Sequence, residues 1–240
     1  MKKKLLAGLM AATLALGSLM FTPSAAAQEA EELTVSEQSL EEAFKYLADG
    51  DYDAALRKYN EVIYFNPNFA EAYNERGIVF GKLGEFDRAI EDFDKAIELN
   101  PQNTEAYYNR GMAYHMLEQY DRAIENYDMA LEIDPDFVEA YNNCGAAYYA
   151  LKQYARAVIE YTKAIEIAPT FAPAYSNRGE AYNSLAKYDR AIADCTKAIE
   201  LEPDYAEAYY NRGVAYQASG KKKRADADFE KARALGYVFE

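Results

Sequence analysis

Apolar residues recur along this 240-residue chain with two periods at once. Within short stretches they fall three or four residues apart, as Leu40, Ala43, Phe44 and Leu47 do, which predicts amphipathic helices. Over longer distances the pattern repeats every 34 residues, and each recurrence ends in a proline: Pro67, Pro101, Pro135, Pro169 and Pro203. Since proline cannot continue a helix, each one ends a helical segment at the same place. The spacing therefore predicts a stack of similar helical segments.

Small and aromatic residues hold matched places in each repeat. One glycine and one alanine per repeat are expected to let two helices approach closely; they are Gly77, Gly111, Gly145, Gly179 and Gly213, and Ala89, Ala123, Ala157, Ala191 and Ala225. An aromatic residue followed by aspartate marks a turn between the two helices, at Phe86-Asp87, Tyr120-Asp121 and Tyr188-Asp189. We expect these aspartates to cap the second helix, and Ala155 to leave its helix uncapped at a cost of about 1 kcal/mol.

This pattern resembles the tetratricopeptide repeat family, whose repeat is a helix–turn–helix. The resemblance covers about residues 36–239 and implies an all-α fold, a right-handed superhelical solenoid of about six helix–turn–helix repeats. The repeats would span 36–69, 70–103, 104–137, 138–171, 172–205 and 206–239. The first is degenerate, as is usual for a terminal repeat, and the acidic residues 28–35 before it are expected to be a loose lead-in.

The N-terminus has the pattern of a bacterial secretory signal peptide. Three lysines precede an apolar run from Leu5 to Phe21, and small residues follow up to Ala27. We expect cleavage after Ala27, which places the mature protein in the periplasm or outside the cell. The alternative is an uncleaved membrane anchor, although the apolar run is short for a membrane span.

The chain is acidic, with a net charge of −14 that becomes −17 without residues 1–27. Nucleic acids and anionic membrane surfaces attract clustered positive charge, so this balance argues against both as partners. It favours a partner with basic or neutral segments. The one basic cluster, residues 221–224, is interpreted as a solvated turn.

Recurring charged residues, the two cysteines and a short tail are given structural roles. Arginine recurs at Arg76, Arg110, Arg178 and Arg212, and acids recur in the second helices at Asp92, Glu160, Asp194 and Asp228, so we expect ion pairs inside the repeats. Cys144 and Cys195 are interpreted as small buried residues and not as a disulfide. The apolar tail of residues 235–239 is expected to fold back as a cap, with a contact surface as the alternative.

An asparagine ladder is the main candidate for partner binding. Asn109, Asn143, Asn177 and Asn211 lie 34 residues apart, at position six of their repeats. The resemblance implies that positions two, five, six, nine, twelve and thirteen line a concave groove. A side-chain amide can both donate and accept, as a peptide bond does, so the ladder fits an extended peptide backbone. It fits equally well a structural role in which each amide bonds a neighbouring helix.

Other groove candidates follow from the same register. Glu71, Glu105, Glu139 and Glu207 would form an acidic edge, while Ile78 and Val214 would belong to an apolar floor. The partner-binding candidates besides the ladder are Asn74, Tyr108, Met112, His115, Tyr149 and Tyr210. The family's carboxylate clamp needs lysine and arginine at groove positions that here carry other residues, so binding of acidic chaperone tails is not expected.

The chain has no expected catalytic site, metal site or cofactor. His115 is the only histidine, and no second histidine or cysteine is spaced as a metal ligand. We therefore expect a non-enzymatic scaffold or assembly factor of the bacterial envelope that binds a protein or peptide segment and no small-molecule substrate. The alternatives are a structural solenoid that self-associates through its terminal repeats, and an accessory subunit of an envelope enzyme.

Overall fold

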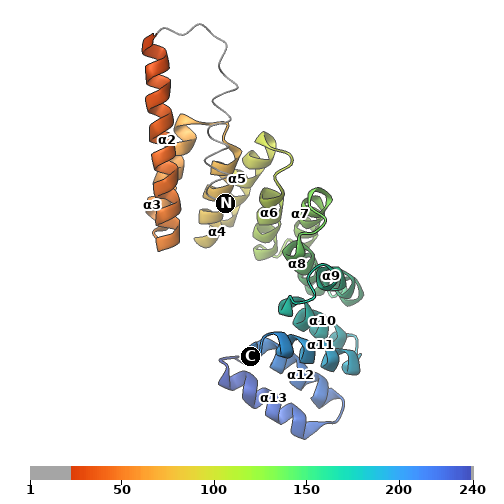
Figure 1. Cartoon of the computed structure of the whole chain (residues 1–240). Helices are drawn as coiled ribbons and strands as arrows, with labels where there is room; N and C mark the ends of the chain where they lie inside the picture. Colours follow the sequence, from red (N-terminus) through yellow and green to blue (C-terminus); the bar gives the residue numbers. More distant parts are fainter. Residues whose placement is uncertain (1–22, 239–240) are drawn as a thin grey trace. The chain divides into compact units, whose positions relative to one another are not determined.

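The structure is a computed structural model that describes residues 23–238, with side chains from Ser36 onward. Twelve helices form this part of the chain and it holds no strand (Figure 1). The fold is an all-α repeat solenoid of about six helix–turn–helix repeats, as the sequence predicts. The chain divides into an N-terminal body ending at Leu117 and a C-terminal body beginning at Glu118.

The N-terminal body holds two helix pairs and a fifth helix. They are α2 (Pro23–Asp49), α3 (Tyr52–Phe65), α4 (Ala70–Lys82), α5 (Phe86–Leu99) and α6 (Thr104–Met116). Each helix packs on the next, and α6 also contacts α4. The two first helices of successive repeats therefore lie beside each other on one face of this body.

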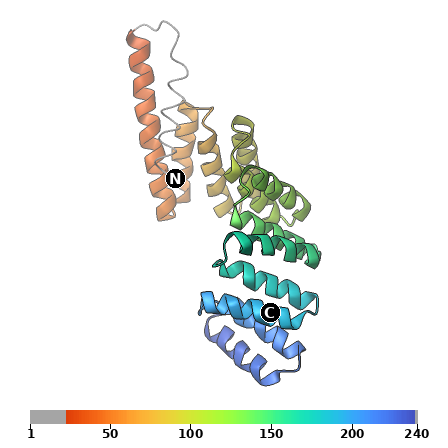
Figure 2. The ribbon, with the colours of Figure 1, turned by 45° about the vertical axis from the view of Figure 1, so that its right-hand side comes forward.

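The C-terminal body continues the same alternation. Its helices are α7 (Tyr120–Ile133), α8 (Val138–Ala150), α9 (Tyr154–Ile167), α10 (Ala172–Ser184), α11 (Tyr188–Leu201), α12 (Ala206–Ala218) and α13 (Lys222–Ala234). The helices from α10 to α13 lie side by side in both views of the ribbon (Figures 1 and 2). Here too the first helices contact their equivalents, α8 with α10 and α10 with α12.

The glycines make the close helix contacts that the sequence predicts. A Cβ atom added to Gly145 would lie 2.6 Å from a ring carbon of Tyr161 on the second helix of the same repeat. Gly77 faces Phe93 and Gly213 faces Phe229 in the same way. In the fifth repeat Gly179 faces the sulfur of Cys195. Each glycine thus provides the space for one large or polarisable core side chain.

The predicted ion pairs form in three repeats. Arg178 Nε lies 2.7 Å from Asp194 Oδ2, and its Nη2 lies 2.9 Å from Oδ1, which is bidentate geometry. Arg76–Asp92 and Arg212–Asp228 repeat it. The third and fourth repeats differ: Arg110 pairs with Asp94, and Glu160 pairs with Lys163.

The predicted aspartate caps are wrong. The second helices begin two residues earlier than expected, at the aromatic residue, so that Asp87, Asp121 and Asp189 lie inside the first turn. The cap positions belong to Glu85, Gln119 and Lys187, none of which makes a side-chain cap bond. The aspartates still favour these helices, because a negative charge in the first turn offsets the helix dipole.

The prediction for residues 28–35 was wrong, whereas the structure agrees with the prediction for the C-terminal tail. Residues 28–35 are helical and belong to α2, where they extend the first helix of repeat 1 towards its N-terminus. The prediction of a loose lead-in was therefore wrong. Most of the predicted signal peptide, residues 1–22, lies outside the described residues. At the other end Tyr237 stacks on Tyr210, with ring centroids 4.5 Å apart, as expected for a tail that caps the last repeat.

The structure shows the state of both cysteines and the length and hydropathy of each described helix. Cys144 and Cys195 are both buried and free, and burial raises the pKa of both thiols. Between residues 23 and 238 no helix combines the length and the apolar character that crossing a membrane requires.

Candidate functional site: the first-helix face

The side chains predicted to bind a partner lie on the first helices of the repeats, a surface that we call the first-helix face. In the N-terminal body it is formed by α4 and α6, with α5 behind them. In the C-terminal body it is formed by α8, α10 and α12.

A pocket of about 290 Å³ opens on this face of the N-terminal body. Two of the predicted site residues, Asn109 and Met112, line it. The other lining residues come from all three helices: Ile78, Gly81, Lys82, Phe86, Phe93, Ala113 and Met116. Met112 is 40% exposed and Met116 is 61% exposed. An apolar hollow with exposed methionines is typical of a surface that adapts to a partner's side chain.

The asparagine ladder makes hydrogen bonds between neighbouring repeats. Asn109 Nδ2 donates to Asn74 Oδ1 at 3.1 Å, and Asn177 Nδ2 donates to Asn142 Oδ1 at 2.9 Å. Asn211 Nδ2 donates to Ser176 Oγ at 3.3 Å. In every case the acceptor lies 35 residues earlier, on the first helix of the preceding repeat. These three asparagines therefore each join two first helices within one body.

Two of the predicted partner-binding asparagines are buried. Asn74 and Asn211 are each 3% exposed, and the backbone oxygen of Asn211 accepts a further bond from Asn183. A partner could reach little of either side chain, so we give both a structural role. Asn109, Asn143 and Asn177 are half-buried, and partner binding stays a prediction for them. The bond from Asn109 uses only one amide N–H, which leaves the other N–H and the carbonyl oxygen for a partner.

Glu75 interrupts the ladder. It stands at position six of repeat 2, where the four following repeats have asparagine, and it is only 5% exposed. The residue 35 positions before it is Leu40, which is buried and apolar. Burial, together with the negative charge of Glu105, raises the pKa of Glu75 to about 7.

In the C-terminal body the face is rich in hydroxyl and carboxylate groups. The Tyr149 hydroxyl lies 3.1 Å from Ser184 Oγ, and burial raises the pKa of Tyr149 to about 12. The Tyr205 hydroxyl donates to Glu207 at 3.3 Å. Burial and the charge of Glu207 raise the pKa of Glu180, although a hydrogen bond with Tyr149 opposes this shift. Such a surface offers acceptors for donor groups of a partner.

The remaining predicted residues have mixed placements. Tyr210 packs against Phe229 and stacks on Tyr237, so it belongs to the C-terminal cap. Tyr108 and His115 are half-buried on α6. Burial lowers the pKa of His115, which favours its neutral form. Among residues 23–238 no group of histidine, cysteine and acidic side chains could hold a metal ion.

Several residues of the pocket were not predicted from the sequence. Lys82 and Met116 both stand at position thirteen of their repeats, and Gly81 stands at position twelve. The register of the groove could have identified all three. Phe86 belongs to the second helix of its repeat, and its part in the pocket follows only from the packing of α4, α5 and α6.

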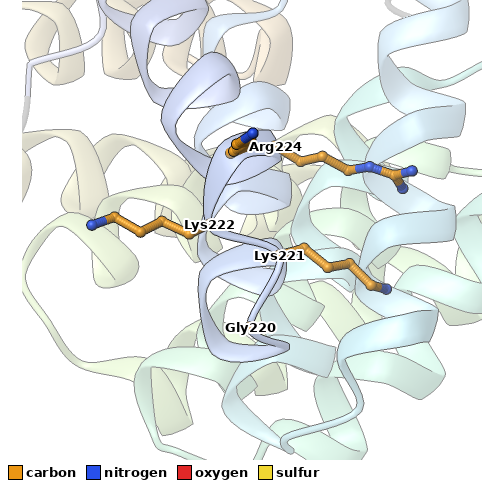
Figure 3. A pocket seen from close by; sticks show the side chains of 5 residues that line it. Gly220, Lys221, Lys222 and Arg224 are labelled. Atoms are coloured by element: carbon orange, nitrogen blue, oxygen red, sulfur yellow. The ribbon is translucent and has the colours of Figure 1, made fainter.

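A second, shallower hollow lies at the basic turn before α13 and is lined by residues 220–224. Lys221 and Arg224 extend to one side of the turn and Lys222 to the other (Figure 3). Lys221 Nζ lies 3.7 Å from Asp189, and both Lys221 and Arg224 lie over the ring of Tyr216. These contacts agree with the interpretation of a solvated turn.

Several solved protein structures are similar to this chain. MamA is 29% identical over 72% of this chain and 94% of its own, with a TM-score of 0.64. YrrB, described as a TPR protein with an unusual peptide-binding site, is 25% identical over 74% of this chain and 92% of its own, with a TM-score of 0.61. A tetratricopeptide repeat protein from Parabacteroides merdae ATCC 43184 has a TM-score of 0.73 at 22% identity, covering 85% of this chain and 81% of its own, which shows the shared fold alone.

Family models match most of the repeats directly. A tetratricopeptide repeat model matches residues 70–103, 104–137, 138–171 and 172–205. A TPR repeat model matches residues 45–84, and a further tetratricopeptide repeat model matches residues 195–227. A search of curated proteins found no match. Because the matched repeats cover more than half of its length, this chain belongs to the tetratricopeptide repeat family.

Proposed function

We propose that this chain is a non-enzymatic scaffold of the bacterial envelope that binds an extended segment of a partner protein on its first-helix face. Proteins with this fold are generally interaction scaffolds, and its structural neighbours include a protein described by its peptide-binding site. The observation that carries the proposal is the apolar pocket beside Asn109, with Met112 and Met116 exposed at its mouth.

The binding mode follows from the groups on the face. The pocket takes an apolar side chain of the segment, and burial of the two methionines drives association. Beside the pocket, Asn109 holds the backbone of the segment, because its amide has donor and acceptor capacity beyond its bond to Asn74. On the C-terminal body, Asn143 and Asn177 present the same kind of side chain to a peptide backbone. Each backbone contact contributes on the order of 0.5–1.5 kcal/mol.

A pull-down from an envelope extract tests this proposal. Wild type is compared with the triple variant Asn109→Ala/Asn143→Ala/Asn177→Ala, and melting curves check that the variant is folded. We expect the variant to lose a partner that the wild type retains. A folded variant that keeps every partner would remove the ladder from the binding site.

The envelope location rests on the signal-peptide pattern of residues 1–27. Mass spectrometry of the protein from the periplasmic and medium fractions of a bacterial expression host tests it. We expect a mature chain that begins at Gln28. A full-length chain found only in the cytoplasm would contradict the location and leave the binding proposal intact.

Self-association through the terminal repeats receives less support at the C-terminal end. The stack of Tyr237 on Tyr210 covers apolar surface there. The outward helix α13 carries Lys222, Lys223 and Arg224 in its first turn, which does not suit an apolar stacking interface.

A further inference from the structure

The pocket of the N-terminal body carries a single charge. Among its nine lining residues Lys82 alone is ionised, and the others are apolar, glycine or asparagine. Lys82 lies in the last turn of α4 and is exposed to solvent. No described carboxylate forms an ion pair with it, whereas Lys58, Lys95, Lys163 and Lys197 each pair with a glutamate of their own helix. The pocket thus has a cation whose charge no described residue neutralises.

The pocket has room for a large apolar side chain. Its volume of about 290 Å³ corresponds to roughly ten water molecules at liquid density. The rings of Phe86 and Phe93 and the side chain of Ile78 line it, while Met112 and Met116 are exposed around it. Water in such a hollow gains few hydrogen bonds, so an apolar side chain displaces it favourably.

Charge determines which residue of the partner should stand next to the apolar side chain that enters the pocket. The chain as a whole is acidic, with 40 Asp and Glu against 26 Lys and Arg, so a strongly acidic segment is repelled from most of its surface. Lys82 makes the pocket an exception at one point. A partner carboxylate beside the apolar side chain finds there a cation with no competing acid, and a partner lysine or arginine meets a like charge.

We propose that this pocket binds a leucine-, methionine- or phenylalanine-sized side chain of an extended partner segment, and that Lys82 selects an acidic residue next to it. The inference rests on the proposed function and names the residues that the face selects. An extended chain advances 3.3–3.6 Å per residue, so the acid stands one or two residues from the apolar side chain. Asn109, in the wall of the pocket, is placed to bond the backbone between them.

Peptide selection on the full-length chain tests the proposal without a known partner. Random twelve-residue peptides are displayed and selected against the wild-type chain. The enriched sequences are synthesised with a fluorophore, and their dissociation constants are measured by fluorescence anisotropy. We expect enriched peptides to share an apolar residue with glutamate or aspartate within two positions, and to lose at least tenfold in affinity when that acid becomes lysine.

Matched variants locate the binding. Met112→Glu places a charge at the pocket, and Met129→Glu is its control, because Met129 on α7 has the same exposure, 39% against 40%, and lies outside the pocket. We expect Met112→Glu to weaken binding at least tenfold and Met129→Glu to leave it within twofold. Lys82→Glu should reverse the preference, so that the lysine form of each peptide binds better than the acidic form. Lys95→Glu, on α5 of the same body, should keep the wild-type preference.

The outcomes separate the two proposals. If no enriched peptide binds saturably to the folded chain, the proposed function fails. If peptides bind but lack the apolar–acidic pair, or bind Met112→Glu as well as wild type, or keep their acidic preference on Lys82→Glu, the present inference is overturned while the proposed function stands.

Discussion

Glu75 shows how one substitution in a repeat changes the chemistry of its position. Asparagine at position six donates to a polar side chain of the preceding first helix, as Asn177 does to Asn142. The equivalent neighbour of Glu75 is Leu40, which has no polar group to offer. The carboxyl group is therefore buried without the partner that the register supplies elsewhere. Its burial and the charge of Glu105 raise its pKa to about 7, although a hydrogen bond with Asn74 opposes the shift.

Stability should consequently fall as the pH rises through the range that this group titrates. A carboxyl group with a raised pKa binds its proton more tightly in the folded than in the unfolded state, so its ionisation opposes folding between about pH 4.5 and pH 7. Glu75→Gln should raise the free energy of unfolding by up to about 3 kcal/mol at pH 8 and by little at pH 4.5.

Urea denaturation across this pH range measures the effect. Glu91→Gln is the control, since Glu91 is exposed on α5 of the same body. Equal pH profiles for wild type and Glu75→Gln would show that Glu75 is not the titrating group.

The sequence predicted on which face a side chain lies better than it predicted which groups that side chain contacts. The register placed Asn109 and Met112 on one face, and both line the pocket. It could not show that Asn74 and Asn211 are buried, because burial depends on how far successive first helices overlap. The importance of Lys82 depends on the absence of a nearby carboxylate, which a repeat pattern does not encode.

In repeats 2, 4 and 6 a glycine on the first helix interlocks with an aromatic ring on the second helix. Gly145→Ala would bring a methyl group within 2.6 Å of Tyr161, which is 2% exposed and has little room to move. We expect a loss of about 1–3 kcal/mol in the free energy of unfolding, from overpacking.

Gly81→Ala provides the matched comparison, because nothing lies within 4 Å of an added Cβ atom there. It should stabilise α4 by about 0.5–1 kcal/mol, since glycine is a poorer helix former than alanine. Denaturant melts of both variants measure this. The account of the helix contacts would be wrong if both substitutions had effects of the same sign and size.

The buried arginine–aspartate pairs fasten the same helix pairs at a second point. Arg178 and Asp194 have side chains only 16% and 12% exposed, so removing one partner leaves a charge poorly solvated. Asp194→Ala should lower the free energy of unfolding by about 3 kcal/mol. Glu200→Ala, which breaks the exposed pair Lys197–Glu200, should cost less than about 1 kcal/mol. Comparable losses in chemical denaturation would show that burial adds nothing to the Arg178–Asp194 pair.

Element boundaries followed from the prolines and glycines, but the helix starts did not. The aspartate after each aromatic residue looked like a cap, yet the aromatic residue is already helical, and the cap position holds Glu85, Gln119 or Lys187. A sequence rule for caps considers side-chain chemistry, whereas here the helix begins with the aromatic residue that packs into the repeat. The long α2 was missed for a related reason, because acidic composition alone suggested a loose segment.

The whole molecule combines an acidic surface with a localised apolar pocket. The chain has a net charge of −14, and beside that pocket Lys82 is a cation with which no described carboxylate forms an ion pair. The 34-residue period was enough to predict an all-α repeat solenoid, because each repeat contacts chiefly its neighbours. The same period predicts no partner, because it does not encode residues that break it, such as Lys82, to which we assign the selection of an acidic partner residue.

We infer that the first-helix face, at the pocket, contacts a partner protein in the cell. Site-specific photo-crosslinking tests it most directly, with a photoreactive amino acid replacing Met112 in one strain and Met129 in another. We expect a discrete crosslinked adduct of the full-length chain from position 112 and none from position 129. An adduct from position 129 alone, or no adduct from position 112 while the protein is folded and present at normal levels, would contradict it.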